Sequence, residues 1–134
     1  MDWISKRENC KTHQIKRISK KIADMPLGSL MLIANTKILD QYIKNIPNGE
    51  FRSTKQIRRD LAKQFECDVT CPLTTGIFIR IISEAAYQEY KNSNGLSSIT
   101  PFWRVVNKES KLAHKLTCGI PFIAERQKNE KIKY

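Results

Sequence analysis

The chain carries few thiol and imidazole side chains, the groups that combine nucleophilic or proton-carrying chemistry near neutral pH with soft metal ligation. It has four cysteines and two histidines, which are Cys10, His13, Cys67, Cys71, His114 and Cys118. The spacing of Cys10 and His13 is typical of half a zinc site, and Cys67 with Cys71 would supply the other half. We expect reduced thiols, because the sequence has no secretory signal that would favour disulfides. We expect no metal site, because Cys10 lies in a polar basic segment.

A cysteine nucleophile needs a lowered pKa and a base beside it. Cys71 comes just before an expected helix, where the helix dipole lowers the pKa of a thiol. No histidine is near Cys71 in the sequence. We therefore expect a structural thiol at this position.

The stretch Thr100-Pro101-Phe102-Trp103-Arg104-Val105-Val106 combines two large aromatic residues and a guanidinium group. Proline fixes its own φ and favours an extended residue before it, and the two valines favour a strand. The pattern predicts a short turn that presents Phe102 and Trp103 and runs into a buried strand. The alternative is that both aromatic rings belong to the core.

A second face of one predicted helix, residues 74–91, differs from its apolar stripe. The stripe contains Ile77, Phe78, Ile81, Ile82, Ala85 and Ala86. Gly76, Arg80, Ser83 and Tyr87 follow one another at spacings that place them on one side of a helix. Small residues permit a close approach, and Arg80 would project between them. The alternative is an exposed arginine on a solvated helix.

Charge is the most informative feature of the composition. The 134 residues include 24 Lys and Arg against 13 Asp and Glu, a formal net charge of +11. This excess favours polyanionic partners such as nucleic acid, although a merely basic protein has the same composition. No apolar run approaches the roughly 20 residues of a membrane span. We expect a cytoplasmic, nucleoid-associated monomer that binds double-stranded DNA and no membrane.

The elements that would position these residues are mainly helical. Residues 1–26 read as a partly ordered basic tail, in which Ile15, Ile18 and Ile22 have helical spacing. Residues 27–134 form the folded domain. Asn35 and Ser53 are predicted N-caps of two helices, 36–45 and one that begins after Ser53. The second of these and helix 74–91 would form a helix-turn-helix. Val105-Val106 and the region of Leu112 would form a hairpin, and a last helix would span 121–131.

This order of parts resembles the C-terminal, DNA-binding domain of the alkylguanine-DNA alkyltransferases (methylated-DNA–protein cysteine methyltransferases). The matching pieces are the turn Ile46-Pro47-Asn48-Gly49, the helix-turn-helix, Pro101-x-x-Arg104-Val105 and a last helix after a glycine. The implied fold is mainly α, a winged helix-turn-helix with a short β-hairpin wing. The family motif Pro-Cys-His-Arg-Val has Phe102 and Trp103 at its cysteine and histidine positions. The chain is thus most similar to the alkyltransferase-like proteins that lack the nucleophile.

The resemblance also implies roles for particular residues. Arg80 matches the arginine that fills the gap left by a flipped nucleotide, and Ser83 matches a small residue at the minor groove. Glu130 matches a glutamate that completes the hydrogen-bonded site. The expected DNA-binding residues are Thr74, Thr75, Arg80, Ser83, Arg58 and Arg59, and the expected base pocket is formed by Phe102, Trp103 and Arg104.

The function that follows is non-enzymatic recognition of damaged, alkylated bases in DNA, by base flipping and without a cofactor. Two alternatives remain open. One is a plain winged-helix DNA-binding protein with Phe102 and Trp103 in its core, and the other is an active alkyltransferase that uses a different cysteine. A cavity beside Phe102 and Trp103 that faces Arg80 would distinguish recognition of a flipped base from plain winged-helix DNA binding.

Overall fold

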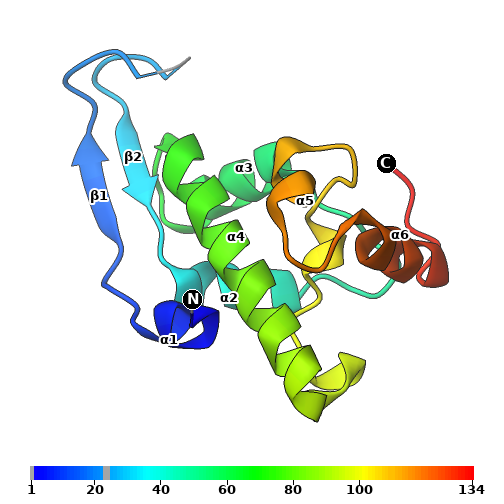
Figure 1. The fold of residues 1–134 in the computed structure, drawn as a ribbon. Helices are drawn as coiled ribbons and strands as arrows, with labels where there is room; N and C mark the ends of the chain where they lie inside the picture. The colour runs from blue at the N-terminus through cyan, green and yellow to red at the C-terminus, as the bar shows by residue number, and fades with distance from the viewer. Residues whose placement is uncertain (1, 23–24) are drawn as a thin grey trace.

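The fold is mainly helical with a small sheet at one side (Figure 1). The computed structural model describes residues 2–22 and 25–134. The sheet contains strands β1 (Gln14–Arg17), β2 (Leu30–Ile33) and β3 (Val69–Thr70) in the order β1-β2-β3. β1 pairs antiparallel with β2, and β3 pairs parallel with β2.

The helices lie on one side of the sheet and form most of the core (Figure 1). They are α1 (Trp3–Glu8), α2 (Thr36–Lys44), α3 (Thr54–Gln64), α4 (Pro72–Glu89), α5 (Lys111–Lys115) and α6 (Ile120–Asn129). A π-helical turn, Tyr90–Asn94, extends α4, and two 3-10 turns follow it, η2 (Leu96–Ser98) and η3 (Phe102–Arg104). In the part of the chain that the structure describes, none of the helices combines the length and apolar character that crossing a membrane requires.

The two N-caps predicted from the sequence are confirmed. The Asn35 side chain accepts a hydrogen bond from the backbone N–H of Ile38 at 2.8 Å, and α2 begins at the next residue. Ser53 Oγ accepts from the backbone N–H of Gln56 at 3.1 Å and begins α3 in the same way. Each cap satisfies an amide that would otherwise have no partner in the first helical turn.

Helix α4 organises the molecule. It crosses the front of the view in Figure 1, with β1 and β2 on one side and α5 and α6 on the other. Ile79 and Ile82 of α4 are fully buried and lie in the main core cluster together with Leu39 of α2 and Leu61 of α3. A smaller buried cluster contains Ile18, Met25, Met31 and Cys71, close to the antiparallel pair of strands β1 and β2.

The N-terminal segment contributes two ordered elements. Residues 14–17 form strand β1, so the helix that the spacing of Ile15 and Ile18 favoured is wrong at these positions. The strand forms because the edge of β2 needs a partner, and Ile15 pairs with Leu32 in register. Helix α1 packs along α4, where Gln88 Oε1 accepts hydrogen bonds from the first backbone amides of α1 at 3.0 and 3.1 Å.

The predicted hairpin at Val105-Val106 is wrong. Val105 has φ −130° and ψ −7°, and its N–H donates to the carbonyl of Phe102 at 3.1 Å, which closes a 3-10 turn. The side-chain amide of Gln127 donates to the carbonyls of Trp103 and Val106 at 3.0 and 2.8 Å. These carbonyls are thus satisfied by α6 and not by a second strand. Helix α5 occupies the place of the expected wing, and the sheet lies on the opposite side of α4.

Candidate functional site

The aromatic pair of the turn η3 lies inside the protein. Phe102 is 0% exposed and Trp103 is 4% exposed. Phe102 stacks on Phe122 of α6 with ring centroids 6.0 Å apart, and meets the Trp103 ring edge-on at 5.5 Å. The Phe102 ring is therefore not available to stack on an incoming base in this structure, because α6 already covers it.

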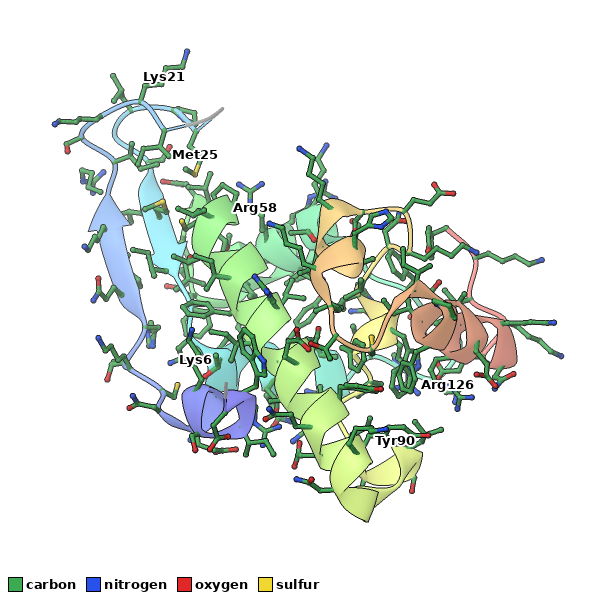
Figure 2. The ribbon with its side chains drawn as sticks, viewed as in Figure 1. Lys6, Lys21, Met25, Arg58, Tyr90 and Arg126 are labelled. Atoms are coloured by element: carbon green, nitrogen blue, oxygen red, sulfur yellow. The ribbon has the colours of Figure 1, made fainter. Side chains whose placement is uncertain are left out.

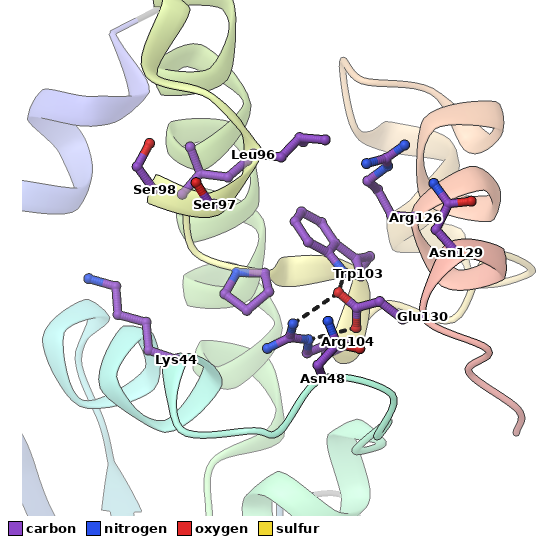
Figure 3. Close-up of a pocket in the computed structure, with 12 residues that line it drawn as sticks. Lys44, Asn48, Leu96, Ser97, Ser98, Trp103, Arg104, Arg126, Asn129 and Glu130 are labelled. Carbon is purple, nitrogen blue, oxygen red and sulfur yellow. Dashed lines mark hydrogen bonds and ion pairs between the residues drawn. The ribbon is translucent and has the colours of Figure 1, made fainter.

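Glu130 joins Trp103 and Arg104 in one hydrogen-bonded network (Figure 3). Trp103 Nε1 donates to Glu130 Oε2 at 2.8 Å. Arg104 holds the same carboxylate with two bonds, from Nε at 2.8 Å and from Nη2 at 2.9 Å. Arg104 Nη1 also donates to the carbonyl of Ile46 at 2.8 Å, and the N–H of Gly49 donates to Glu130 Oε1 at 3.2 Å. The network connects the turn after α2, η3 and the end of α6.

The electrostatics of this network favour an ionised glutamate. Burial alone would raise the pKa of Glu130, but the hydrogen bonds from Arg104, Trp103 and Gly49 outweigh it. The pKa of the carboxyl group therefore lies below its ordinary value. The Glu130 and Arg104 side chains are only 11% and 14% exposed, so each is the main counter-charge of the other.

A cavity of about 630 Å³ opens beside this network. Figure 3 shows Trp103, Arg104 and Glu130 on one wall and Lys44 at the end of α2 on another. The remaining residues that line it are Asn48, Leu96, Ser97, Ser98, Ile99, Pro101, Arg126 and Asn129. Among these described residues there is none from α4. The cavity is thus bordered by Trp103 but not by Arg80, and the two sites that base flipping would combine lie apart in this structure.

Arg80 lines a different hollow, a groove of about 340 Å³ along the first half of α4. The groove is lined by Pro72, Leu73, Gly76, Ile77, Arg80, Leu112 and Lys115. The expected neighbourhood of Gly76 and Arg80 is therefore present. The Arg80 guanidinium lies over the Trp3 ring of α1 at 5.4 Å, and its Nε is buried without a hydrogen-bond partner among the described residues.

Two expected DNA-binding side chains are not on the surface. Thr75 is 0% exposed and donates its hydroxyl hydrogen to the carbonyl of Cys71 at 2.7 Å. Ser83 is 1% exposed and donates in the same way to Ile79 at 2.7 Å. Both hydroxyls are satisfied by the preceding turn of the helix, as is common for Ser and Thr inside helices. Neither can contact DNA in this conformation, which corrects that part of the prediction.

The other side chains expected to contact DNA differ in their exposure and in their hydrogen bonds. Arg58 Nε donates to the carbonyl of Thr70 at 2.9 Å, and Thr70 Oγ1 donates to the carbonyl of Arg58 at 2.7 Å. This reciprocal pair holds α3 against β3, so Arg58 has a structural role. Arg59 is exposed, and Thr74 is half-buried with its hydroxyl oxygen lacking a partner among the described residues.

The sequence did not reveal that two large apolar residues of α4 face solvent. Leu73 is 72% exposed and Ile77 is 48% exposed, although Ile77 was expected in the apolar stripe. The fully buried residues Ile79 and Ile82 define the inward face, and Leu73 and Ile77, four residues apart, lie off it. A helical plot centred on Ile79 instead of Ile77 would have separated the two faces.

The thiols belong to no metal-binding group in the part of the chain that the structure describes. There, no three His, Cys, Asp or Glu side chains are grouped so that they could hold a metal ion. Burial, followed by the charge of Glu84, raises the pKa of Cys118 to about 11. Burial, followed by the charge of Asp68, also raises the pKa of Cys67. Both shifts disfavour the thiolate that an alkyl transfer needs.

The chain was also compared with known proteins. A scan of protein-family models, a search of curated proteins and a search of solved structures each find no match to this chain.

Proposed function

We propose that the protein binds double-stranded DNA through the first half of α4, and that it does so without catalysing a reaction. The observation that carries the proposal is the groove along α4. It combines Arg80 and Lys115 with the exposed Leu73 and Ile77, and no carboxylate belongs to the described residues that line it. A surface of this kind is complementary to a polyanion with apolar groups inside it.

Exposed cations lie on elements at both sides of α4 (Figure 1). Lys16, Lys20 and Lys21 lie on β1 and the loop that follows it, and Arg59, Lys63, Lys111 and Lys115 lie on α3 and α5. None of them forms an ion pair with another described residue. In Figure 2, Lys21 lies at the end of the molecule where α4 begins. Phosphate contacts from such side chains provide most of the affinity of non-specific DNA binding.

The covering of α4 explains why the first half of the helix is the proposed contact. Helix α1 packs along α4 and is anchored at its far end, where Arg7 Nη1 pairs with Glu89 Oε1 at 2.5 Å. Nearer the start, Gly76 has no atom within 4 Å of the position that a Cβ would take, so the backbone is open there. In helix-turn-helix proteins, the recognition helix contacts base edges with its N-terminal residues.

The test is the salt dependence of binding to a fluorescently labelled duplex of about 20 base pairs. Binding by phosphate contacts predicts an affinity that falls steeply with salt. Each contact contributes about 0.9 to the negative slope of the logarithm of the binding constant against the logarithm of the salt concentration. The double variant Lys111→Gln/Lys115→Gln is expected to lower the slope by about 2. Lys128→Gln on α6, an exposed lysine outside the groove, serves as the matched control and should leave the slope unchanged. Absence of binding at low salt would refute the proposal.

Recognition of an alkylated base is the second candidate, favoured by the cavity beside Trp103. Its volume of about 630 Å³ lies in the range of small-molecule sites, and the indole forms part of its wall. The test compares duplexes with and without one alkylguanine. A preference for the lesion that Trp103→Phe reduces would support this candidate, whereas equal affinity for both duplexes would leave plain DNA binding as the function.

A further inference from the structure

The exposed pair Leu73 and Ile77 has no role in the core. Leu73 is 72% and Ile77 48% exposed, and the two side chains are one helical turn apart on the same side of α4. Both border the groove, together with the apolar side chains of Pro72 and Leu112. Single exposed apolar residues are common on proteins, but a contiguous pair on a helix at a candidate interface indicates a contact surface.

The charges around the pair indicate the kind of partner. Arg80 and Lys115 line the same groove, and the neighbouring exposed cations have no ion-pair partner among the described residues. A formal net charge of +11 opposes the approach of a second copy of this chain. An apolar centre with a cationic rim is instead complementary to the base stack and the phosphates beside it.

We propose that Leu73 and Ile77 form an apolar wedge that inserts at a base step, so that the protein prefers duplexes whose base stacking is already weakened. This inference rests on the proposed function and adds the class of DNA substrate. Apolar side chains such as leucine and isoleucine partly unstack and kink DNA when they enter a step from the minor groove. The cost of unstacking is lowest at flexible or mispaired steps, so the preference follows from the deformation and not from base contacts.

The position of the pair on α4 suits this role. Leu73 lies in the first turn and Ile77 in the second, the part of the helix that α1 leaves open. The open backbone at Gly76 lies between them on the same surface and would allow the DNA backbone to come close. Arg80 follows one turn after Gly76 and lines the same groove, with its guanidinium over the Trp3 ring of α1.

The experiment compares three duplexes of equal length: one fully paired and rich in G·C, one with a central TA step and one with a central mismatch. Binding is measured by anisotropy, and bending by energy transfer between dyes at the two ends. We expect about tenfold tighter binding to the mismatched duplex, an intermediate affinity for the TA duplex, and a shorter end-to-end distance in both complexes.

The double variant Leu73→Ala/Ile77→Ala removes the wedge and keeps the cations. Because both side chains are exposed, circular dichroism should show an unchanged fold. We expect the preference for the mismatched duplex to fall to about onefold and bending to disappear, while the affinity for the fully paired duplex changes less than about twofold. Lys115→Gln is the matched control, and it should lower the affinity for all three duplexes by the same factor.

The outcomes separate this inference from the proposed function. Equal binding of the wild type to all three duplexes, or an unchanged preference in the double variant, overturns the wedge and leaves DNA binding intact. If the protein binds none of the three duplexes, both the wedge and the proposed DNA binding are overturned. Self-association, or binding to an acidic polypeptide, that the double variant abolishes would assign the pair to a protein partner and overturn the wedge.

Discussion

Replacing Glu130 by glutamine would test the network that holds the turn η3. In the wild type, Glu130 accepts hydrogen bonds from Trp103, from two nitrogens of Arg104 and from Gly49. Glutamine has one acceptor oxygen, and its amide group would face the donors of Arg104 and Trp103. The substitution therefore removes the counter-charge of Arg104 and places donor against donor.

The expected cost follows from the burial of the pair. The two side chains are 11% and 14% exposed, so water can replace the lost carboxylate only in part. Breaking a buried ion pair by removing one partner costs about 3–5 kcal/mol, and the remaining exposure places Glu130→Gln near about 3 kcal/mol. A domain of this size has a total stability of about 5–15 kcal/mol, so the loss would be a large fraction of it.

The dependence on pH gives the prediction a second test. The pKa of Glu130 lies below its ordinary value of 4.5, so the ionised carboxylate stabilises the folded state above the unfolded pKa. This contribution is lost as the pH falls through the folded pKa. The difference in unfolding free energy between wild type and Glu130→Gln should therefore be full at pH 7 and shrink steadily below about pH 4.5.

Urea unfolding followed by far-ultraviolet circular dichroism, repeated between pH 3 and pH 7, measures both quantities. The control is Glu125→Gln, which removes a 67% exposed glutamate that pairs with Arg126 on the same helix at 3.4 Å. Its expected cost is below about 1 kcal/mol. A cost below about 1 kcal/mol for Glu130→Gln at pH 7, or an equal cost at pH 3, would refute this account of the network.

Four further predictions concern single side chains. Phe102→Ala should lower the free energy of unfolding by about 3–5 kcal/mol in urea titrations, because its ring is fully buried; a small loss would contradict its place in the core. Ser53→Ala should cost about 1 kcal/mol through the lost cap of α3, and Ser53→Asp should restore it. In thiol labelling at neutral pH, read by peptide mass spectrometry, the exposed Cys10 should react long before Cys118, whose pKa is raised to about 11. In an ultraviolet pH titration Tyr42 should ionise after the ordinary tyrosines, near pH 12, because burial and then a carboxylate partner raise its pKa; ionisation near pH 10 would contradict this contact.

Elements with a complete local signal were predictable from the sequence. Asn35 and Ser53 each supply a side-chain oxygen three residues before an unpaired amide, and the helices after them begin where that chemistry places them. These signals lie within one turn of chain, so the rest of the fold does not override them. Helix α4 begins at Pro72, two residues before the predicted start at Thr74, in line with the preference of proline for the first turn.

Elements decided by distant partners were not predictable. Ile15 and Ile18 suit a helix by their spacing, but the free edge of β2, thirteen or more residues later, makes residues 14–17 a strand. Val105 and Val106 favour a strand by residue type, yet the amide of Gln127 on α6 holds the carbonyl of Val106. In both cases a long-range hydrogen bond determines the local conformation.

In the candidate site, too, features set by local spacing were predictable and features set by tertiary packing were not. The shared position of Gly76 and Arg80 followed from helical spacing, whereas the burial of Thr75 and Ser83 depends on which face of α4 the core occupies. The exposed Leu73 and Ile77 were missed for the same reason. An apolar stripe drawn from residue type alone is wider than the face that packs.

The pairing of β1 with β2 has a consequence for how the chain can be shortened. A fragment that begins at Leu27 would lack β1, and the outer edge of β2 would expose unpaired amides and carbonyls next to the buried Met31 and Leu32. Such an edge recruits strands from other molecules and leads to aggregation. In the whole chain the outermost strand is instead β1, where Lys16 and Arg17 are exposed and their charges oppose strand addition. The basic hairpin thus protects the sheet against polymerisation.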